Sequence, residues 1–365
     1  MQKCLLINLK MKAIQIIDPI KDIRWDHFVS KHPLGWICHL SGWKRVLENS
    51  FPHMKGYYIA LRAESEEGFQ AGLPIFHVRS RILGNRLVAA PFATLFDPLV
   101  SSARQFRPLL EAVRGLAAEL KTGSIEIRAL AAGRLMEGCG LAASYFYKHH
   151  YLKLEPGPAA LIKKFHRTCV RQRINRARAS DLKLKVGSAE EDLKEFYRLF
   201  KITRRRVRRP VQPYRFLKGL WDVFRPAGRL ELLLALKEER VLGGLVLFKF
   251  KDRVSAEFAA YDDGFKNVSP NHFLFWEAIQ RAHRQGFRLF DFGRTAPDNH
   301  DLMDFKRRWG TAVVDLPKFF SLPKLAEAVA QADQSWKVRL AQTIIGRAPD
   351  CAQELISAAI YRHMG

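Results

Sequence analysis

The sequence is poor in acidic residues, in cysteines and in long apolar runs. Its 365 residues hold 36 Asp and Glu against 61 Lys and Arg, which gives a formal net charge of +25 at pH 7. The five cysteines form no C-x-x-C pair, so a disulfide scaffold and the usual zinc patterns are excluded. The longest apolar runs, such as 241–248, have the length of a strand and are too short to cross a bilayer. These absences predict a soluble protein of a reducing compartment.

A secretory signal is also missing at the N-terminus. The apolar stretch at 4–7 is far too short for a signal core, so we expect a cytoplasmic protein. Met11 opens an expected strand, and residues 1–10 are therefore interpreted as an extension or a misassigned start.

Several catalytic signatures are absent as well. The chain has no Walker A loop, no H-E-x-x-H and no G-x-S-x-G. Asp291-Phe292-Gly293 spells the magnesium motif of protein kinases, but no Gly-rich loop or H-R-D motif accompanies it. The twelve histidines never fall at metal-ligand spacing, so we expect no metal site and no tightly bound cofactor.

The sequence contains only a loose match to the pyrophosphate-binding loop of acetyl-CoA enzymes. Arg134 precedes Gly138-Cys139-Gly140, but the spacing is one residue too long and the segment leads into a strand. The corresponding turn of the second half, 262–271, lacks the loop too. Such a loop binds phosphates through free backbone N–H groups. Its absence argues against an ordinary acetyl-CoA enzyme.

The order of expected elements is the same in both halves. Each half reads as helices, an antiparallel set of strands, a helix and a further strand. Helices are expected near 102–120, 190–208, 214–224 and 271–285, and a long strand near 142–153. This order predicts an α/β (α+β) fold of two tandem acyltransferase-like (GNAT-like) subdomains, each a mainly antiparallel mixed sheet flanked by helices. The predicted boundaries are 11–155, 156–322 and a helical C-terminal tail over 323–365.

Positive charge is concentrated between Lys163 and Arg209. This stretch of 47 residues holds 17 Lys and Arg against 5 Asp and Glu, a net charge of +12. The like charges of such a face repel one another, which costs free energy when no negatively charged partner binds. We therefore expect a polyanionic partner, although part of the face is interpreted as merely solvated.

Two local patterns place cations beside aromatic residues. The first is the arginine-rich block 203–213, which closes one helix and opens another at Pro213. In the second, a strand over 289–294 ends at a Gly turn, and a short helix then presents Lys306 between aromatic residues. A cation of this kind can meet a phosphate or an oxyanion while the aromatic rings stack on a base or sugar.

With these patterns the chain resembles the FemAB-related (FemABX-like) transferases, most of all the FemAB-like proteins of exopolysaccharide and exosortase (PEP-CTERM) loci. The resemblance runs from about Met11 to Leu322, and its markers lie at 39–45, 73–75, 90–92, 125–128, 203–213, 290–294 and 305–310. It implies two GNAT-like subdomains around a cleft. It also implies transfer of an amino acid from aminoacyl-tRNA to an amine of a peptidoglycan precursor in the cytoplasm.

The resemblance assigns the chemistry to the segment 289–310. The essential Lys of the family's F-K pair matches Lys306, with Phe305 beside it. Its ammonium would stabilise the oxyanion formed when an amine attacks an ester. Asp291 and Arg294 match positions where the cleft opens, and Asp291 is alternatively interpreted as a cap of the following turn.

Substrate-binding positions follow from the same resemblance. Arg45 and Arg206 match a phosphate-binding pair, and Tyr261 matches an aromatic residue at the end of a cleft strand, or else a core residue. The chain also departs from the family. Leu130 stands where some members have an Asp once considered a base, and Arg208 stands where Gly is usual.

Three functions therefore remain open. The first is a cytoplasmic N-acyltransferase that uses aminoacyl-tRNA and modifies a nucleotide- or lipid-linked cell-envelope precursor. The second takes its acyl group from acyl-CoA or an acyl carrier protein and modifies an exopolysaccharide sugar. The third is a non-enzymatic protein that binds RNA or a membrane surface, since Trp336, Lys337 and Arg339 are placed on a basic amphipathic tail. Peripheral association with the inner membrane face fits the first and third functions.

Overall fold

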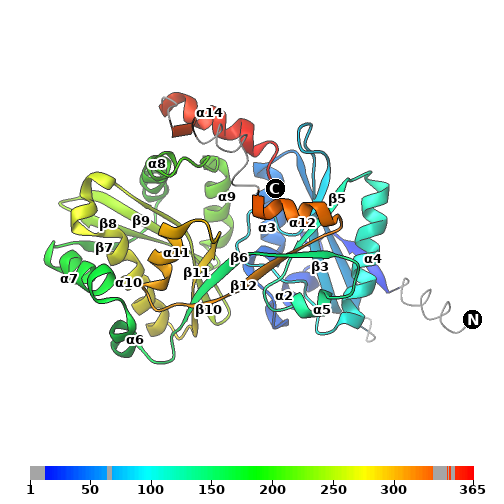
Figure 1. The fold of residues 1–365 in the computed structure, drawn as a ribbon, viewed down its shortest axis with the longest axis horizontal. Helices are drawn as coiled ribbons and strands as arrows, with labels where there is room; N and C mark the ends of the chain where they lie inside the picture. Colours follow the sequence, from blue (N-terminus) through cyan, green and yellow to red (C-terminus); the bar gives the residue numbers. More distant parts are fainter. Residues whose placement is uncertain (1–12, 64–67, 332–342, 344, 347–349) are drawn as a thin grey trace, which may run out of the picture. The chain divides into compact units, whose positions relative to one another are not determined.

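The computed structural model describes residues 13–63, 68–331, 343, 345–346 and 350–365 (Figure 1). The chain divides into two compact units. The first lies within Met1–Phe146, Leu316–Ser335 and Ala359–Gly365, and the second within Tyr147–Asp315 and Trp336–Ala358. The boundaries expected at 155 and 322 stay predictions. Trp336, Lys337 and Arg339, the basis of the expected basic tail, lie outside the described residues, as do residues 1–10.

The first unit is a mixed sheet with helices packed against it. Its strands lie in the order β1 (Ile14–Ile17), β2 (Met54–Arg62), β3 (Phe69–Val78), β4 (Arg86–Val88), β5 (Ser124–Arg128) and the end of β12 (Ala312–Phe320). Only β4 and β5 run parallel. Its helical elements are α2 (Arg24–Lys31), the 3-10 turn Ile37–His39, α3 (Ser41–Ser50), α4 (Ala103–Glu119), α5 (Gly133–Met136) and α12 (Pro323–Gln331).

The second unit repeats this plan. Its strands lie in the order β6 (Ala142–Lys153), β11 (Leu289–Thr295), β10 (Arg253–Tyr261), β9 (Arg240–Phe250), β8 (Leu230–Lys237) and β7 (Lys183–Val186). The pair β10 and β11 is parallel, and the other pairs are antiparallel.

Helices cover both faces of this second sheet. They are α6 (Pro158–Lys164), a π turn over Arg167–Arg171, α7 (Gln172–Ala179), α8 (Glu190–Arg206), α9 (Tyr214–Phe224), the 3-10 turn Asp263–Val268, α10 (Pro270–Arg284) and α11 (His300–Arg307). Helix α14 (Asp350–Tyr361) contacts α8, where Gln353 donates to the backbone oxygen of Lys201. Two consecutive glycines of β9 let helices approach from opposite sides. A Cβ on Gly243 would lie 3.2 Å from Leu274 of α10, and one on Gly244 would lie 2.6 Å from Phe196 of α8. Successive residues of a strand point to opposite faces, so α10 and α8 lie on different faces of the sheet.

The expected fold is confirmed: each unit is a mainly antiparallel mixed sheet flanked by helices. The periodic segments match closely, with α4, α8, α9 and α10 in place of the four expected helices and β6 over 142–153. Strand β12 was not anticipated. Its first four residues are exposed and it contains Pro317, so it shows neither the alternation nor the composition of a strand.

Within the part of the chain that the structure describes, no helix has both the length and the apolar character needed to span a bilayer.

Candidate active site

The site is built where the parallel strands β10 and β11 stop pairing. Their register ends at the pair Ser255 and Asp291. Both strands are irregular there. The register of β10 against β9 shifts around Glu257, and that of β11 against β6 shifts just before Gly293, which has a φ of +71°. Irregularities of this kind re-aim side chains and end the pairing of strands.

Lys306 reaches this point from helix α11. The helix begins after Asn299, whose side chain accepts a hydrogen bond from the backbone N–H of Leu302. The Lys306 ammonium donates to the backbone oxygen of Gly293 at 3.1 Å and to that of Arg294 at 2.9 Å. Only 5% of Lys306 is exposed. An ammonium has three N–H donors, and these bonds use two of them, so one N–H remains for a reacting oxygen.

The surroundings of Lys306 change its protonation. Burial lowers the pKa of Lys306 to about 7, because the charged form loses its hydration. The carboxylates of Asp291 and Glu257 raise this pKa, and the charge of Arg294 lowers it. Near neutral pH the side chain therefore exists in both the charged and the neutral form. Perturbed values of this kind are frequent at functional sites.

Asp291 lies beneath the surface. It is fully buried, and its two oxygens are bound by His149 Nε2 and, at 2.9 Å, by Arg253 Nη1. The resemblance placed Asp291 where a cleft opens, and the residue instead lies in the interior. The negative charge of Asp291 nevertheless acts on Lys306 electrostatically and raises the pKa of Lys306. The role of Asp291 in catalysis stays a prediction, and its burial favours an indirect one.

Sequence reasoning missed three residues of this arrangement: His149, Arg253 and Glu257. Glu257 accepts a hydrogen bond of 2.6 Å from the Ser255 hydroxyl. Ser255 and Glu257 are polar residues two positions apart, which places them on the same face of a regular strand. This polar pair was the signal by which the sequence could have indicated Glu257. His149 and Arg253 gave no signal, because only tertiary structure brings them to Asp291.

Aromatic packing fixes the position of α11. The Phe305 ring lies edge-on to Phe275 and to His272, with centroid separations of 5.5 and 5.6 Å. Trp309 is fully buried and stacks on His272. Phe305 itself is half-buried. Burial lowers the pKa of His272 to about 4, so this ring is neutral at physiological pH.

Arg294 and His150 complete the surroundings of Lys306. The guanidinium of Arg294 lies over the ring of Tyr147, 5.0 Å from its centroid. His150 contacts the Met303 sulfur, and burial together with the positive charge of Lys306 lowers the pKa of His150 to about 4.

Arg206 and Tyr261 form a second group in the same unit. The guanidinium of Arg206 lies 4.1 Å above the centre of the Tyr261 ring, and its Nη1 pairs with Asp263 at 2.9 Å. The backbone of Tyr261 is tied to α8 through the hydroxyl of Thr203. Arg45 belongs to the first unit, where it is exposed on α3.

The turn between β10 and α10 has few free backbone donors. The amides of Gly264, Phe265, Val268 and Ser269 donate to oxygens of the turn itself. Pro270 opens the helix and has no N–H. The turn also carries Asp262 and Asp263. With these amides engaged, the turn offers few backbone N–H groups to a diphosphate.

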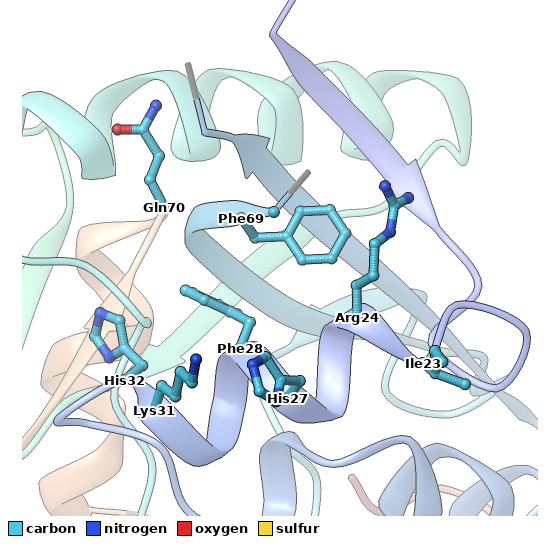
Figure 2. Close-up of a pocket in the computed structure, with 9 residues that line it drawn as sticks. Ile23, Arg24, His27, Phe28, Lys31, His32, Phe69 and Gln70 are labelled. Atoms are coloured by element: carbon cyan, nitrogen blue, oxygen red, sulfur yellow. The ribbon is translucent and has the colours of Figure 1, made fainter. Parts of the chain in front are cut away.

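A separate pocket of about 550 Å³ lies in the first unit, between α2 and the start of β3 (Figure 2). Arg24, His27 and Lys31 line it together with the rings of Phe28 and Phe69. None of the predicted site residues lines this pocket. Among the described residues, no group of His, Cys, Asp and Glu has the arrangement of a metal site.

Comparison with known proteins defines the class of this chain. Residues 164–307 match the family model of the acetyltransferase (GNAT) domain, so the chain carries a GNAT domain and is an acyltransferase. The matched segment holds strands β7 to β11, helices α7 to α11 and Lys306.

The fold is that of FemX-like proteins. The crystal structure of FemX is 17% identical, with a TM-score of 0.68 over 87% of this chain and 100% of that one. The C-terminal domain of a putative lysylphosphatidylglycerol synthetase from Agrobacterium fabrum is 12% identical, with a TM-score of 0.57 over 87% and 95%. A tandem GNAT protein of the clavulanic acid pathway is 12% identical, with a TM-score of 0.53 over 84% and 97%. The expected FemAB-like, tandem GNAT fold is thus confirmed, and the link to exopolysaccharide or exosortase loci stays a prediction.

Proposed function

We propose that this acyltransferase moves an aminoacyl group from aminoacyl-tRNA to an amine of a nucleotide- or lipid-linked cell-envelope precursor, of peptidoglycan or exopolysaccharide, in the cytoplasm. The observation that carries the proposal is the Lys306 ammonium, buried and held by the carbonyls of Gly293 and Arg294 where β10 and β11 separate. Likeness to FemX and to a putative lysylphosphatidylglycerol synthetase supports aminoacyl transfer in general.

The reaction needs one fixed positive charge at the carbonyl. The acceptor amine attacks the ester carbon of the donor, a C–N bond forms and the C–O bond to the ribose breaks. The proton lost by the amine ends on the departing ribose oxygen. Negative charge develops on the carbonyl oxygen meanwhile, and the remaining N–H of Lys306 would stabilise it by a hydrogen bond. A preorganised donor of this kind contributes about 3 kcal/mol to transition-state stabilisation.

Binding of the acceptor is assigned to the arginines. A guanidinium has five N–H donors and suits a phosphate better than an ammonium does. The Arg206 ion pair with Asp263 uses Nη1, and the Tyr261 ring holds the planar group in place. We propose Arg206 as a contact for the diphosphate of a nucleotide- or lipid-linked acceptor, and the phosphate-binding role that the resemblance gives to Arg45 stays a prediction. Tyr261, Phe305 and Arg294 would contact the rest of the substrates.

The choice of tRNA over acyl-CoA rests on the β10–α10 turn. Its amides are engaged within the turn, so few N–H groups are left there to bind the diphosphate of CoA. Acyl-CoA, or an acyl carrier protein, remains the second candidate donor, for modification of an exopolysaccharide sugar. The match to a GNAT acetyltransferase domain and the likeness to a tandem GNAT protein favour it.

Donor discrimination tests the proposal directly. The purified protein is titrated with aminoacyl-tRNA, uncharged tRNA, acetyl-CoA and a longer acyl-CoA, and the loss of the acyl label to an amine acceptor is measured. We expect transfer only from aminoacyl-tRNA and dependence of the rate on Lys306. Transfer from acyl-CoA, with tRNA inert as a donor, would move the protein to the second candidate function. A peripheral position at the inner membrane face would favour a lipid-linked acceptor, and flotation with vesicles tests it.

A further inference from the structure

The segment from α6 to α7 carries cations without carboxylate partners. The seven Lys and Arg between Lys163 and Arg178 occur with no Asp or Glu in that range. Six of the seven are exposed, and Arg171 is half-buried. None of them forms an ion pair with a described residue. We call these seven side chains the 163–178 surface.

Several cations elsewhere in the same unit have a carboxylate partner. Arg198 pairs with Glu195, Arg240 with Asp262 and Arg288 with Glu155. An exposed cation usually lies near an acidic neighbour in this way, which limits local self-repulsion. On the 163–178 surface no carboxylate of a described residue reduces the repulsion between the cations. This is expected of a surface that binds a negatively charged ligand.

Local packing turns these cations outward. The segment buries one apolar face, on which Leu161, Phe165, Val170, Ile174 and Ala177 join the core of the second unit. Helices α6 and α7 both contact α10 through this face (Figure 1). The cations occupy the remaining, solvent-facing side.

The surface adjoins the candidate active site. The backbone N–H of His166 donates to the oxygen of Arg308 at 2.8 Å, and Gly310 packs against Lys164. Residues 308–310 form the turn that follows α11, the helix that carries Lys306. Arg307, next to Lys306, is exposed and adds a further positive charge at this junction. The surface therefore adjoins the C-terminal end of α11, the helix that carries Lys306.

We propose that the 163–178 surface is the docking surface for the phosphodiester backbone of an RNA, whose acylated end reaches Lys306. The inference deepens the proposed function and rests on its tRNA donor. RNA is favoured over an anionic membrane because none of the large hydrophobic side chains exposed among the described residues lies between 158 and 180. Five of the seven cations are Arg, which binds phosphate with two parallel hydrogen bonds.

The test compares two variants with equal loss of charge. The surface variant carries Lys163→Gln, Arg167→Gln, Arg173→Gln and Arg176→Gln. The control variant carries Lys194→Gln, Arg198→Gln, Arg240→Gln and Arg288→Gln. These four cations have carboxylate partners; three are exposed and Arg198 is half-buried. Binding of uncharged tRNA to the full chain is measured between 50 and 200 mM salt, with circular dichroism as a check on folding.

We expect the surface variant to bind tRNA at least tenfold more weakly at 100 mM salt, while the control variant changes less than threefold. The slope of log K against log salt should fall by about 3 in the surface variant, since each lost phosphate contact removes roughly 0.7–0.9. Equal losses in the two variants, or no loss in either, would overturn the inference. So would a surface variant that loses binding to phosphatidylglycerol vesicles but not to tRNA.

The outcome of this binding experiment does not depend on whether the proposed aminoacyl transfer occurs. Uncharged tRNA has no acyl group, so its binding reports on the surface alone. If tRNA binding depends on the surface but aminoacyl transfer is absent, the docking inference stands and the proposed reaction is wrong.

Discussion

Lys306 donates a hydrogen bond of 2.9 Å to the backbone oxygen of Arg294, which ties helix α11 to the end of strand β11. A second bond, to Gly293, fixes the ammonium from another direction. A buried ammonium that is held but not neutralised by an ion pair is suited to a transient negative charge, and the first prediction follows from this.

Lys306→Ala is expected to lower kcat for aminoacyl transfer about 100- to 1,000-fold, the usual effect of removing an oxyanion donor. Single-turnover transfer from labelled aminoacyl-tRNA measures this. The matched control is Lys194→Ala, an exposed lysine on α8 that should leave the rate within a factor of two. Full activity of a folded Lys306→Ala protein would remove Lys306 from the mechanism.

The pKa of Lys306 gives a pH dependence. Its charged form is the proposed catalyst and its pKa is about 7, so kcat should fall as the pH rises through 7. Neutral acceptor amine increases over the same range, so the rate is measured with the acceptor saturating and corrected for its ionisation. A corrected rate that instead rises through pH 7 would assign the neutral amine of Lys306 to proton transfer.

The same group affects stability. The folded pKa of about 7 lies below the ordinary lysine value of 10.5, so the folded protein disfavours the proton. The cost in free energy is complete below pH 7 and disappears as the pH rises from 7 to 10.5. Lys306→Met is therefore expected to raise Tm more at pH 6 than at pH 10. Thermal unfolding at the two pH values measures the difference, and an effect of the opposite sign would contradict it.

Much of the fold follows from sequence pattern, for reasons visible in single elements. Helix α8 buries Leu193, Phe196 and Phe200 at helical spacing, and its extent was predicted to within two residues. Strand β12 was not predictable, because its pairing with β5 stabilises a segment with Pro317 and an exposed start. Its identity as a strand depends on residues almost 200 positions earlier.

The candidate site likewise contains residues that the sequence predicted and residues that it did not. Lys306 and Phe305 were found because they lie close together in a compact motif. The burial of Asp291 was not foreseen, since it depends on His149 from β6 and Arg253 from β10. Three distant segments make that network, and no local pattern encodes it.

Asp291→Asn should act through Lys306. Asp291 raises the pKa of Lys306, so its neutralisation should lower that pKa further and move the fall in kcat to lower pH. The variant also leaves the buried His149 and the half-buried Arg253 without their carboxylate, at a cost of about 3 kcal/mol in the free energy of unfolding. The pH profile separates the two effects, because a purely structural role would leave the midpoint of the profile unchanged.

Glu257→Gln provides the comparison for Asp291. Glu257 also raises the pKa of Lys306, and it accepts a hydrogen bond from the Ser255 hydroxyl, whereas Asp291 is bound by His149 and Arg253. We expect a shift of the profile in the same direction with a smaller loss of stability. Opposite shifts in the two variants would show that the field at Lys306 is set by other groups.

The last prediction concerns Arg206. Its guanidinium lies over the Tyr261 ring and pairs with Asp263, so it is held in one orientation before substrate binds. Arg206→Lys keeps the charge but loses the planar fork, and the KM for a diphosphate-linked acceptor should rise about tenfold with kcat little changed. An acceptor without the diphosphate should show no difference between the wild type and the variant. Equal effects on both acceptors would mean that Arg206 supports the fold of the β10 end rather than the phosphates.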